Sequence, residues 1–308
     1  MPNDQAMYGL ANSSVKPGLI PAVRTVALAA TVTLLLIQTP DTWAQSSTTV
    51  MTEVPRTAAG KPDFSGLWQA LGSAHWNIEP SAAKAGPDWK LGALGAIPAT
   101  LGVVHDGPLP YTPSGLVQKQ ANEADWLALD PLVKCYMPGV PRANMLPFPF
   151  QIVQGTDNVV MAYEFASAMR IVYMDQPDFD GPVPAWMGHS RGHWEGDTLV
   201  IRVTDFMPYT WFDHAGNHHS DQLEVIERYT PAGPNMILYE AEIRDPQTFT
   251  RPWKMSFPLY RRMEANAQLL EFKCVEFTEE LIYGYLNKDA PPDRVPPRGM
   301  PFTIQEIE

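Results

Sequence analysis

The chain has 308 residues and a formal net charge of −12, with 45% apolar and 18% charged residues. This composition predicts a globular protein with a substantial core, in one large domain or two small ones. Because phosphate binding needs a basic patch and the sequence shows none, we expect no nucleic-acid partner.

Residues 1–44 have the pattern of a secretory signal peptide. Two basic residues, Lys16 and Arg24, flank an apolar run at 26–37 that is too short to span a bilayer, and a small-x-Ala cleavage pattern ends at Ala44. We therefore expect cleavage after Ala44, a periplasmic or secreted mature protein, and no integral membrane span in that mature chain. The alternative is that the segment stays in place as an anchor.

A single domain is expected over residues 45–286, followed by a Pro-rich tail at 287–308. A helix is predicted near 113–128, where Thr112 has the character of an N-cap and Pro113 that of the first helical position.

Short β-rich runs dominate the second half of the chain. They lie at 150–154, 158–165, 169–175, 188–194, 198–206, 223–230, 236–244, 253–262 and 268–277, and a further strand is expected at 63–70. Short strands at regular spacing with turn residues between them predict an antiparallel barrel or sandwich. Alternation is clearest at 237–243, where Ile237, Tyr239 and Ile243 share one face.

The two cysteines, Cys135 and Cys274, are the only ones in the chain. In an oxidising compartment an even count predicts one disulfide, and the alternative is two buried free thiols.

The segment 188–192, GHSRG, matches the G-x-S-x-G pattern of a hydrolase nucleophile elbow. Such an elbow needs a strand before Ser190 and a helix after it, whereas here a loop precedes Ser190 and a strand follows. We predict instead a β-hairpin with its turn at 195–197. A zinc site at His189 and His193 is also disfavoured, because residues four apart on a strand lie roughly 13 Å apart.

The predicted hairpin register places alternate side chains on opposite faces. Trp194 opposite Thr198 puts the following side chains on the buried face with Leu199, Ile201 and Val203: His189, Arg191 and His193. Ser190 then points outward. A cation between two imidazoles is costly to bury without a ligand, which favours a polar, ligand-facing barrel interior.

A second polar group lies at 213–227. Asp213, His214, His218, His219 and Asp221 crowd a loop before a strand whose apolar face includes Glu227. A carboxylate on such a face has a raised pKa unless a cation meets it, as in a general acid or base. The alternatives are a polar loop of hydrogen-bonding histidines, and a metal site built from His214, His218 and His219.

Several long motifs together resemble one protein family. They are DFSGLW, PGVPRANMLPFPFQIVQ, MAYEF, PAWMGHSRGHWEGDTLVI, the spaced Trp211, Asp213, Gly216, His219 and Ser220, ERY, DPQTFTRPW and Cys274-x-Glu276. In these motifs the chain is similar to a large family of exported bacterial proteins that carries no settled activity. The resemblance covers almost the whole mature chain up to Asn287, and it implies a lipocalin-like β-barrel with an interior cavity.

These features predict an exported β-barrel enzyme that performs cofactor-independent acid–base chemistry, as a lyase, isomerase or hydrolase, on a small apolar and aromatic molecule. The expected catalytic residues are His189, Asp213, His219 and Glu227, with no metal. The expected substrate-binding residues are Arg142, Tyr163, Arg191, His193 and Trp211. The alternatives are a non-catalytic carrier with the same cavity and a metal-dependent enzyme that uses the His214, His218 and His219 loop.

Overall fold

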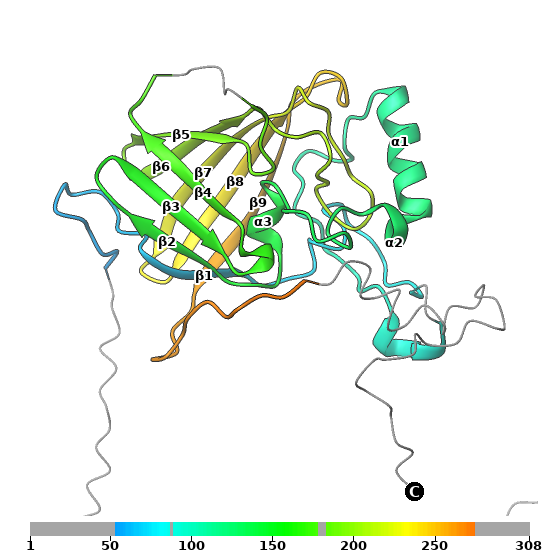
Figure 1. Ribbon diagram of the computed structural model, residues 1–308, viewed down its shortest axis with the longest axis horizontal. Helices are drawn as coiled ribbons and strands as arrows, with labels where there is room; N and C mark the ends of the chain where they lie inside the picture. The colour runs from blue at the N-terminus through cyan, green and yellow to red at the C-terminus, as the bar shows by residue number, and fades with distance from the viewer. Residues whose placement is uncertain (1–52, 87–88, 178–182, 275–308) are drawn as a thin grey trace, which may run out of the picture. The chain divides into compact units, whose positions relative to one another are not determined.

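A computed structural model describes residues 53–86, 89–177 and 183–274. Nine strands close into one barrel in chain order (Figure 1). They are β1 (Gly66–Ala70), β2 (Phe150–Gln154), β3 (Asn158–Tyr163), β4 (Met169–Met174), β5 (His189–Glu195), β6 (Thr198–Thr204), β7 (Glu224–Gly233), β8 (Met236–Arg244) and β9 (Trp253–Arg261). The predicted β-barrel is therefore confirmed.

Two details of the predicted sheet are wrong. Strands β4 and β5 pair in parallel, whereas every other neighbouring pair is antiparallel. The segment between them is long enough to return the chain to the starting end of β4. The run predicted at 268–277 is not a strand over its described part, 268–274.

Short helices occupy the connections outside the sheet. They are η1 (Trp89–Gly95), α1 (Pro113–Ala124), α2 (Trp126–Leu129), α3 (Arg142–Met145) and η2 (Phe165–Ser167). The Thr112 hydroxyl accepts a hydrogen bond from the Gly115 amide, which confirms the expected N-cap and helix start. The predicted signal peptide at 1–44 and the tail at 287–308 lie outside the described residues.

Within the described ranges, no helix is both long enough and apolar enough to cross a membrane.

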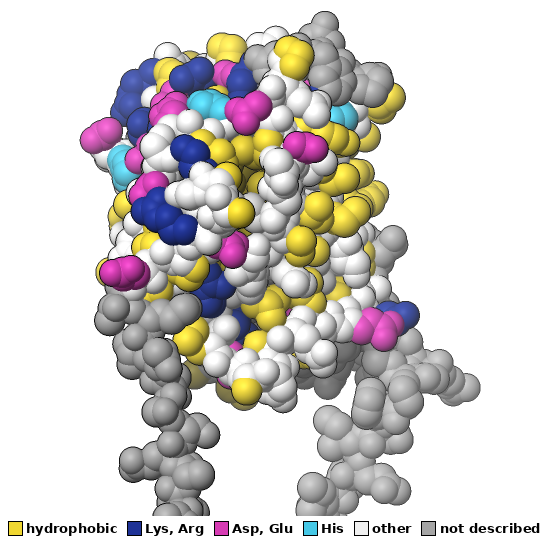
Figure 2. All heavy atoms as spheres, turned by 90° about the vertical axis from the view of Figure 1, so that its left-hand side faces the viewer, with side chains coloured by type: hydrophobic (Ala, Val, Ile, Leu, Met, Phe, Trp, Pro, Cys, Tyr) yellow, Lys and Arg dark blue, Asp and Glu magenta, His cyan; other side chains and the backbone are white. Residues whose placement is uncertain are grey.

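The barrel interior is filled by inward-facing side chains from every strand. The alternation predicted on β8 is confirmed, because Ile237, Tyr239, Ala241 and Ile243 are all fully buried. On the outer flank in Figure 2, acidic and basic side chains are interspersed around a band of hydrophobic ones.

The predicted register of the β5–β6 hairpin is wrong by one residue. Glu195 pairs with Thr198 and Ser190 with Val203, so the turn contains only Gly196 and Asp197. Gly196 has φ of 61°, a conformation that two-residue hairpin turns need and that glycine adopts without a steric penalty. A shift of one residue sends every side chain of β5 to the opposite face.

Candidate functional site

The corrected register reverses the orientations expected for the GHSRG segment. Ser190 is buried inside the barrel, where its hydroxyl lies 3.4 Å from Arg170 Nη1. His189, Arg191 and His193 lie on the outside. His189 Nε2 lies 2.8 Å from the Val183 carbonyl oxygen.

The two other outward side chains of β5 also have partners on the outer surface. Arg191 packs its guanidinium 4.9 Å from the centre of the Tyr173 ring. His193 Nε2 lies 3.2 Å from Glu195 Oε1, and both side chains are about half exposed to solvent. The prediction that His189, Arg191 and His193 line the barrel interior is therefore wrong.

A buried ion pair occupies the centre of the barrel. Glu227 on β7 faces Arg170 on β4, and the Arg170 guanidinium bonds to both carboxylate oxygens, with Nη2 at 3.0 Å from Oε1. Burial by itself would lower the pKa of Arg170, but the facing Glu227 carboxylate outweighs it and raises the pKa above its usual value. The sequence anticipated the carboxylate on this face but not its cation.

Neighbouring polar groups complete this barrel network. Glu227 Oε1 also accepts hydrogen bonds from Asn144 Nδ2 (3.1 Å), the Tyr229 hydroxyl (3.1 Å) and the Tyr239 hydroxyl (2.9 Å). Tyr163, expected to contact substrate, donates to Asn144 Oδ1 at 3.0 Å, and burial raises its pKa to about 12. Since each of these groups already has protein partners, the network is closed, as buried polar networks must be to be stable.

Asp213 organises the loop that follows β6. Its buried carboxylate accepts hydrogen bonds from the backbone amides of Ile78 (2.8 Å) and Ala215 (2.9 Å) and from Asn217 Nδ2 (2.6 Å). Burial raises the pKa of Asp213 to about 6. The contact with Ile78 ties this loop to the segment around residue 75, so Asp213 holds the loop in position, and its expected catalytic role stays a prediction.

The same loop packs closely on helix α1. Gly216 has φ of 84°, and a Cβ built at this position would lie 2.7 Å from the Glu123 amide nitrogen. Only glycine allows this approach of the loop to the helix. Asn122 of α1 reinforces it with a 3.1 Å hydrogen bond to the Gly216 carbonyl oxygen.

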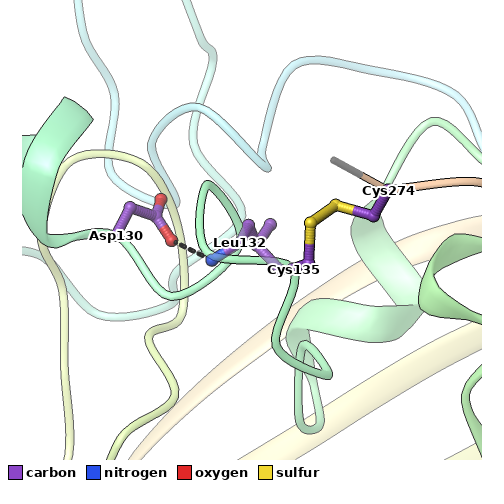
Figure 3. Close-up of a disulfide and its surroundings, with 4 residues drawn as sticks. All are labelled: Asp130, Leu132, Cys135 and Cys274. Atoms are coloured by element: carbon purple, nitrogen blue, oxygen red, sulfur yellow. Dashed lines mark hydrogen bonds between the residues drawn. A yellow bond between two sulfur atoms is a disulfide. The ribbon is translucent and has the colours of Figure 1, made fainter. Parts of the chain in front are cut away.

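A second buried ion pair lies outside the barrel. Asp130, directly after α2, accepts bidentate hydrogen bonds from Arg142 of α3, with Nη1–Oδ1 at 2.8 Å and Nη2–Oδ2 at 2.7 Å. Both side chains are 1% exposed or less. The Leu132 amide donates to Asp130 Oδ1 at 2.9 Å, as Figure 3 shows.

His214 completes this pair. Its Nδ1 lies 2.7 Å from Asp130 Oδ2, and a contact this short between a ring nitrogen and a carboxylate requires a proton on Nδ1. Arg142 Nη2 also approaches Nδ1 at 3.2 Å, but two donors cannot bond to each other, so we assign the proton to the contact with Asp130. Nε2 of neutral His214 then carries the lone pair that can accept a proton.

The protonation states suit a general base. Burial is the largest influence on His214 and lowers its pKa, although Asp130 acts in the opposite direction, so the imidazole is neutral at pH 7. Burial alone would raise the pKa of Asp130. The Arg142 charge and the hydrogen bonds from His214 and Arg142 outweigh it, and they hold this pKa well below the usual range.

A cavity of about 340 Å³ opens beside His214. Its lining is mainly apolar and aromatic: His75, Trp76, Leu132, Val133, Leu146, Pro147, Phe148, Phe165, His214, Phe272, Lys273 and Cys274. The imidazole of His214 packs against both Trp76 and Trp126, with ring centres 4.8 Å and 5.3 Å from it, and the two indoles also contact each other at 5.8 Å. This volume lies at the small end of ligand-binding cavities and fits one aromatic ring with short substituents.

A disulfide closes one side of this cavity. Cys135 and Cys274 are bonded, with their Cα atoms 5.7 Å apart, which confirms the predicted pairing (Figure 3). It fastens the segment after β9, including Phe272, to the turn that begins at Asp130. Phe272 packs against Phe165 at 4.7 Å between ring centres.

The histidines predicted as a metal site have separate partners. His219 is buried with Nε2 2.6 Å from the Thr210 hydroxyl and Nδ1 2.7 Å from the Ser220 carbonyl oxygen, so both ring nitrogens have protein partners, and its expected catalytic role stays a prediction. His218 stacks on Tyr111, and His214 bonds to Asp130. Among the described residues, no three metal-ligating side chains gather at one point.

The structure brings one predicted substrate-binding residue, Arg142, to the cavity region, while Trp211 is buried within the loop after β6, where it pairs with His218. Sequence reasoning missed His75, Trp76, Asp130 and Arg170. The adjacent His75 and Trp76, a polar–aromatic pair in a long Gly- and Pro-rich loop, were the one local signal for this site.

Comparisons with protein-family models, with curated proteins and with solved structures found no match. The family resemblance of the motifs stays a prediction.

Proposed function

We propose that the protein is an enzyme that transfers protons to and from a small aromatic substrate without a cofactor, with His214 as the general base. The single observation behind this proposal is the Asp130–His214 pair at the edge of an aromatic-lined cavity. A carboxylate bonded to Nδ1 fixes the tautomer and stabilises the imidazolium that forms when Nε2 takes a proton.

The lining of the cavity favours proton transfer over covalent catalysis. Its described residues include no serine or threonine, and its one cysteine, Cys274, is in the disulfide. Lys273, the one amine of this lining, is 84% exposed and pairs with Glu271 at 3.3 Å. A lyase or isomerase step therefore fits this lining better than a hydrolysis through an acyl-enzyme.

Ring opening of 5-nitrobenzisoxazole tests the proposal, because this aromatic compound reacts by loss of one carbon-bound proton to a base and releases a coloured phenolate. The full-chain protein is expected to accelerate it, and His214→Gln is expected to lower the rate by a factor of about 10² to 10⁴. Asp130→Asn is expected to lower the rate by less. His105→Gln, a matched change of a half-buried histidine that bonds to Ser256, should leave it unchanged.

The pH dependence gives a second test. Since burial lowers the pKa of His214 below the usual histidine value, its base form predominates at pH 7, and the rate should decline only as the pH falls through that lowered pKa. A rate that is equal in the wild type and His214→Gln would contradict the proposal. Binding of the probe without turnover in either protein would also contradict it and would support a carrier.

A further inference from the structure

The cavity contains a second imidazole besides the proposed base. His75 and His214 both line it, and their ring centres are 6.2 Å apart in an edge-to-face arrangement. Their backbones are joined as well, because the His214 amide donates to the His75 carbonyl oxygen at 3.0 Å. Trp76 contacts both rings, with ring centres 5.9 Å from His75 and 4.8 Å from His214. The two imidazoles can therefore reach neighbouring atoms of one small substrate.

The surroundings of His75 keep it neutral. Burial is the largest influence, His214 and Arg142 act in the same direction, and a backbone hydrogen bond to Gly72 opposes them; together they lower the pKa of His75 to about 4. A neutral imidazole is a poor general acid at pH 7, but its N–H group is a hydrogen-bond donor. Such a donor suits an oxygen whose negative charge develops in the transition state, as the oxygen of an enolate does.

We propose that His75 donates a hydrogen bond to the carbonyl oxygen of the substrate while His214 removes a proton from the adjacent carbon. The substrate class is then an enolisable ketone or aldehyde with an aromatic substituent, whose ring the aromatic side chains of the cavity accept. This inference rests on the proposed role of His214 and adds the role of His75.

The step balances without any other reactant. The C–H bond breaks and its proton goes to His214 Nε2, while its electron pair forms the C=C bond of the enolate and the carbonyl π electrons move to oxygen. His75 hydrogen-bonds to that oxygen. Return of the proton to the same carbon gives exchange, and its return to a conjugated carbon gives an isomer. Because the imidazolium proton of His214 exchanges with water, deuterium enters the substrate in heavy water.

The experiment follows loss of the methylene proton signal of 1-phenylpropan-2-one in heavy water by NMR. The wild type is expected to accelerate this exchange. His75→Phe keeps an aromatic ring but removes the donor, and it should slow the exchange by about 10² to 10³, the usual effect of losing one such donor. His75→Asn, whose amide keeps an N–H, should restore part of the rate.

Ring opening of 5-nitrobenzisoxazole by the same variants separates this role from a structural one. The nitro group already stabilises its phenolate, so His75→Phe should lower that rate less than tenfold, on the order of a single weakened hydrogen bond. An equal loss in both reactions, or a loss in neither, would overturn the role of His75. Ketone exchange absent in a wild type that opens the isoxazole through His214 would overturn the substrate class alone.

Discussion

Two buried Arg–carboxylate pairs, Arg170–Glu227 and Arg142–Asp130, have the same chemistry but different surroundings. Both are bidentate, and all four side chains are 2% exposed or less. In the barrel, the carboxylate of Glu227 also accepts hydrogen bonds from tyrosine hydroxyls and from a side-chain amide. Outside the barrel, the carboxylate of Asp130 also accepts hydrogen bonds from a backbone amide and from His214, whose ring lines a cavity.

The difference shows that burial and a shifted pKa do not by themselves mark a functional site. The tyrosines of the barrel network have raised pKa values because they are buried and lie near Glu227. Each polar group of that network has a protein partner. The Asp130 pair instead positions a neutral imidazole that lines the cavity and that we propose as the general base.

The disulfide lies in the region of the Arg142–Asp130 pair. Its removal should therefore destabilise that region more than the barrel that contains Arg170–Glu227. Replacing Cys135 and Cys274 together by serine opens a loop with a sequence separation of 139 residues. In the chain-entropy model this costs up to about 5 kcal/mol of unfolding free energy, and engineered cases often lose less. Urea unfolding measures the loss. Amide hydrogen exchange should accelerate at 130–135 and 262–274 while β7 and β8 stay protected. Equal acceleration in all of these segments would contradict the view that the disulfide stabilises only the region outside the barrel.

Glu227→Ala tests the barrel pair directly. It leaves the Arg170 charge and several donors buried without an acceptor, and we expect the unfolding free energy to fall by about 3–5 kcal/mol. Glu240→Ala is the matched control on the same hairpin, because Glu240 pairs with Lys254 at 3.1 Å on the outer face. That change should cost about 0–1 kcal/mol. Similar small losses for both variants would show that the barrel network is not structural.

Acidification should destabilise the loops outside the barrel. Burial is the main cause that lowers the pKa of both His75 and His218 to about 4 from 6.5. Their contribution to the free energy of unfolding is therefore complete above pH 6.5 and is lost as the pH falls to 4. After allowance for their partial exposure, each contributes roughly 1–3 kcal/mol. Asp213 acts in the opposite direction, because its pKa is raised to about 6. Urea titrations of the wild type and His218→Gln between pH 7 and 4 measure the contribution of His218 alone. If the unfolding free energy of both proteins falls equally with pH, His218 makes no such contribution.

The smallest effect is expected on the outside of β5. His193 is 52% exposed and pairs with the exposed Glu195, so His193→Ala should change the unfolding free energy by less than about 0.5 kcal/mol. A loss of several kcal/mol would favour the inward orientation that the sequence had predicted.

The strand positions could be predicted from the sequence because alternating side chains, as on β8, depend only on the period of a strand. The orientation of β5 could not, since it depends on whether the turn contains Glu195. Both registers bury Leu199, Ile201 and Val203. The fit of Gly196 to a two-residue turn was the signal that distinguished them, because glycine adopts the positive φ that such a turn needs.

The candidate site was less accessible to sequence reasoning. His214 was identified in a polar loop, but its partners come from three separate segments: His75 and Asp130 from irregular ones and Arg142 from the short helix α3. No periodicity connects such segments, and tertiary contacts such as Asp213–Ile78 and Arg142–Asp130 bring them together. The disulfide was predictable because two cysteines allow only one pairing.

Helix α3 joins the two regions at the level of single side chains. Arg142 bonds to Asp130 on the cavity side, and Asn144, two residues later, bonds to Glu227 in the barrel. One turn of backbone therefore carries a member of one ion pair and a hydrogen-bond partner of the other, so we expect the two pairs to be energetically coupled. Changes at Asp130 and Glu227 should be non-additive in a double-mutant cycle, with a coupling energy of about 0.5–3 kcal/mol, although the two carboxylates do not touch.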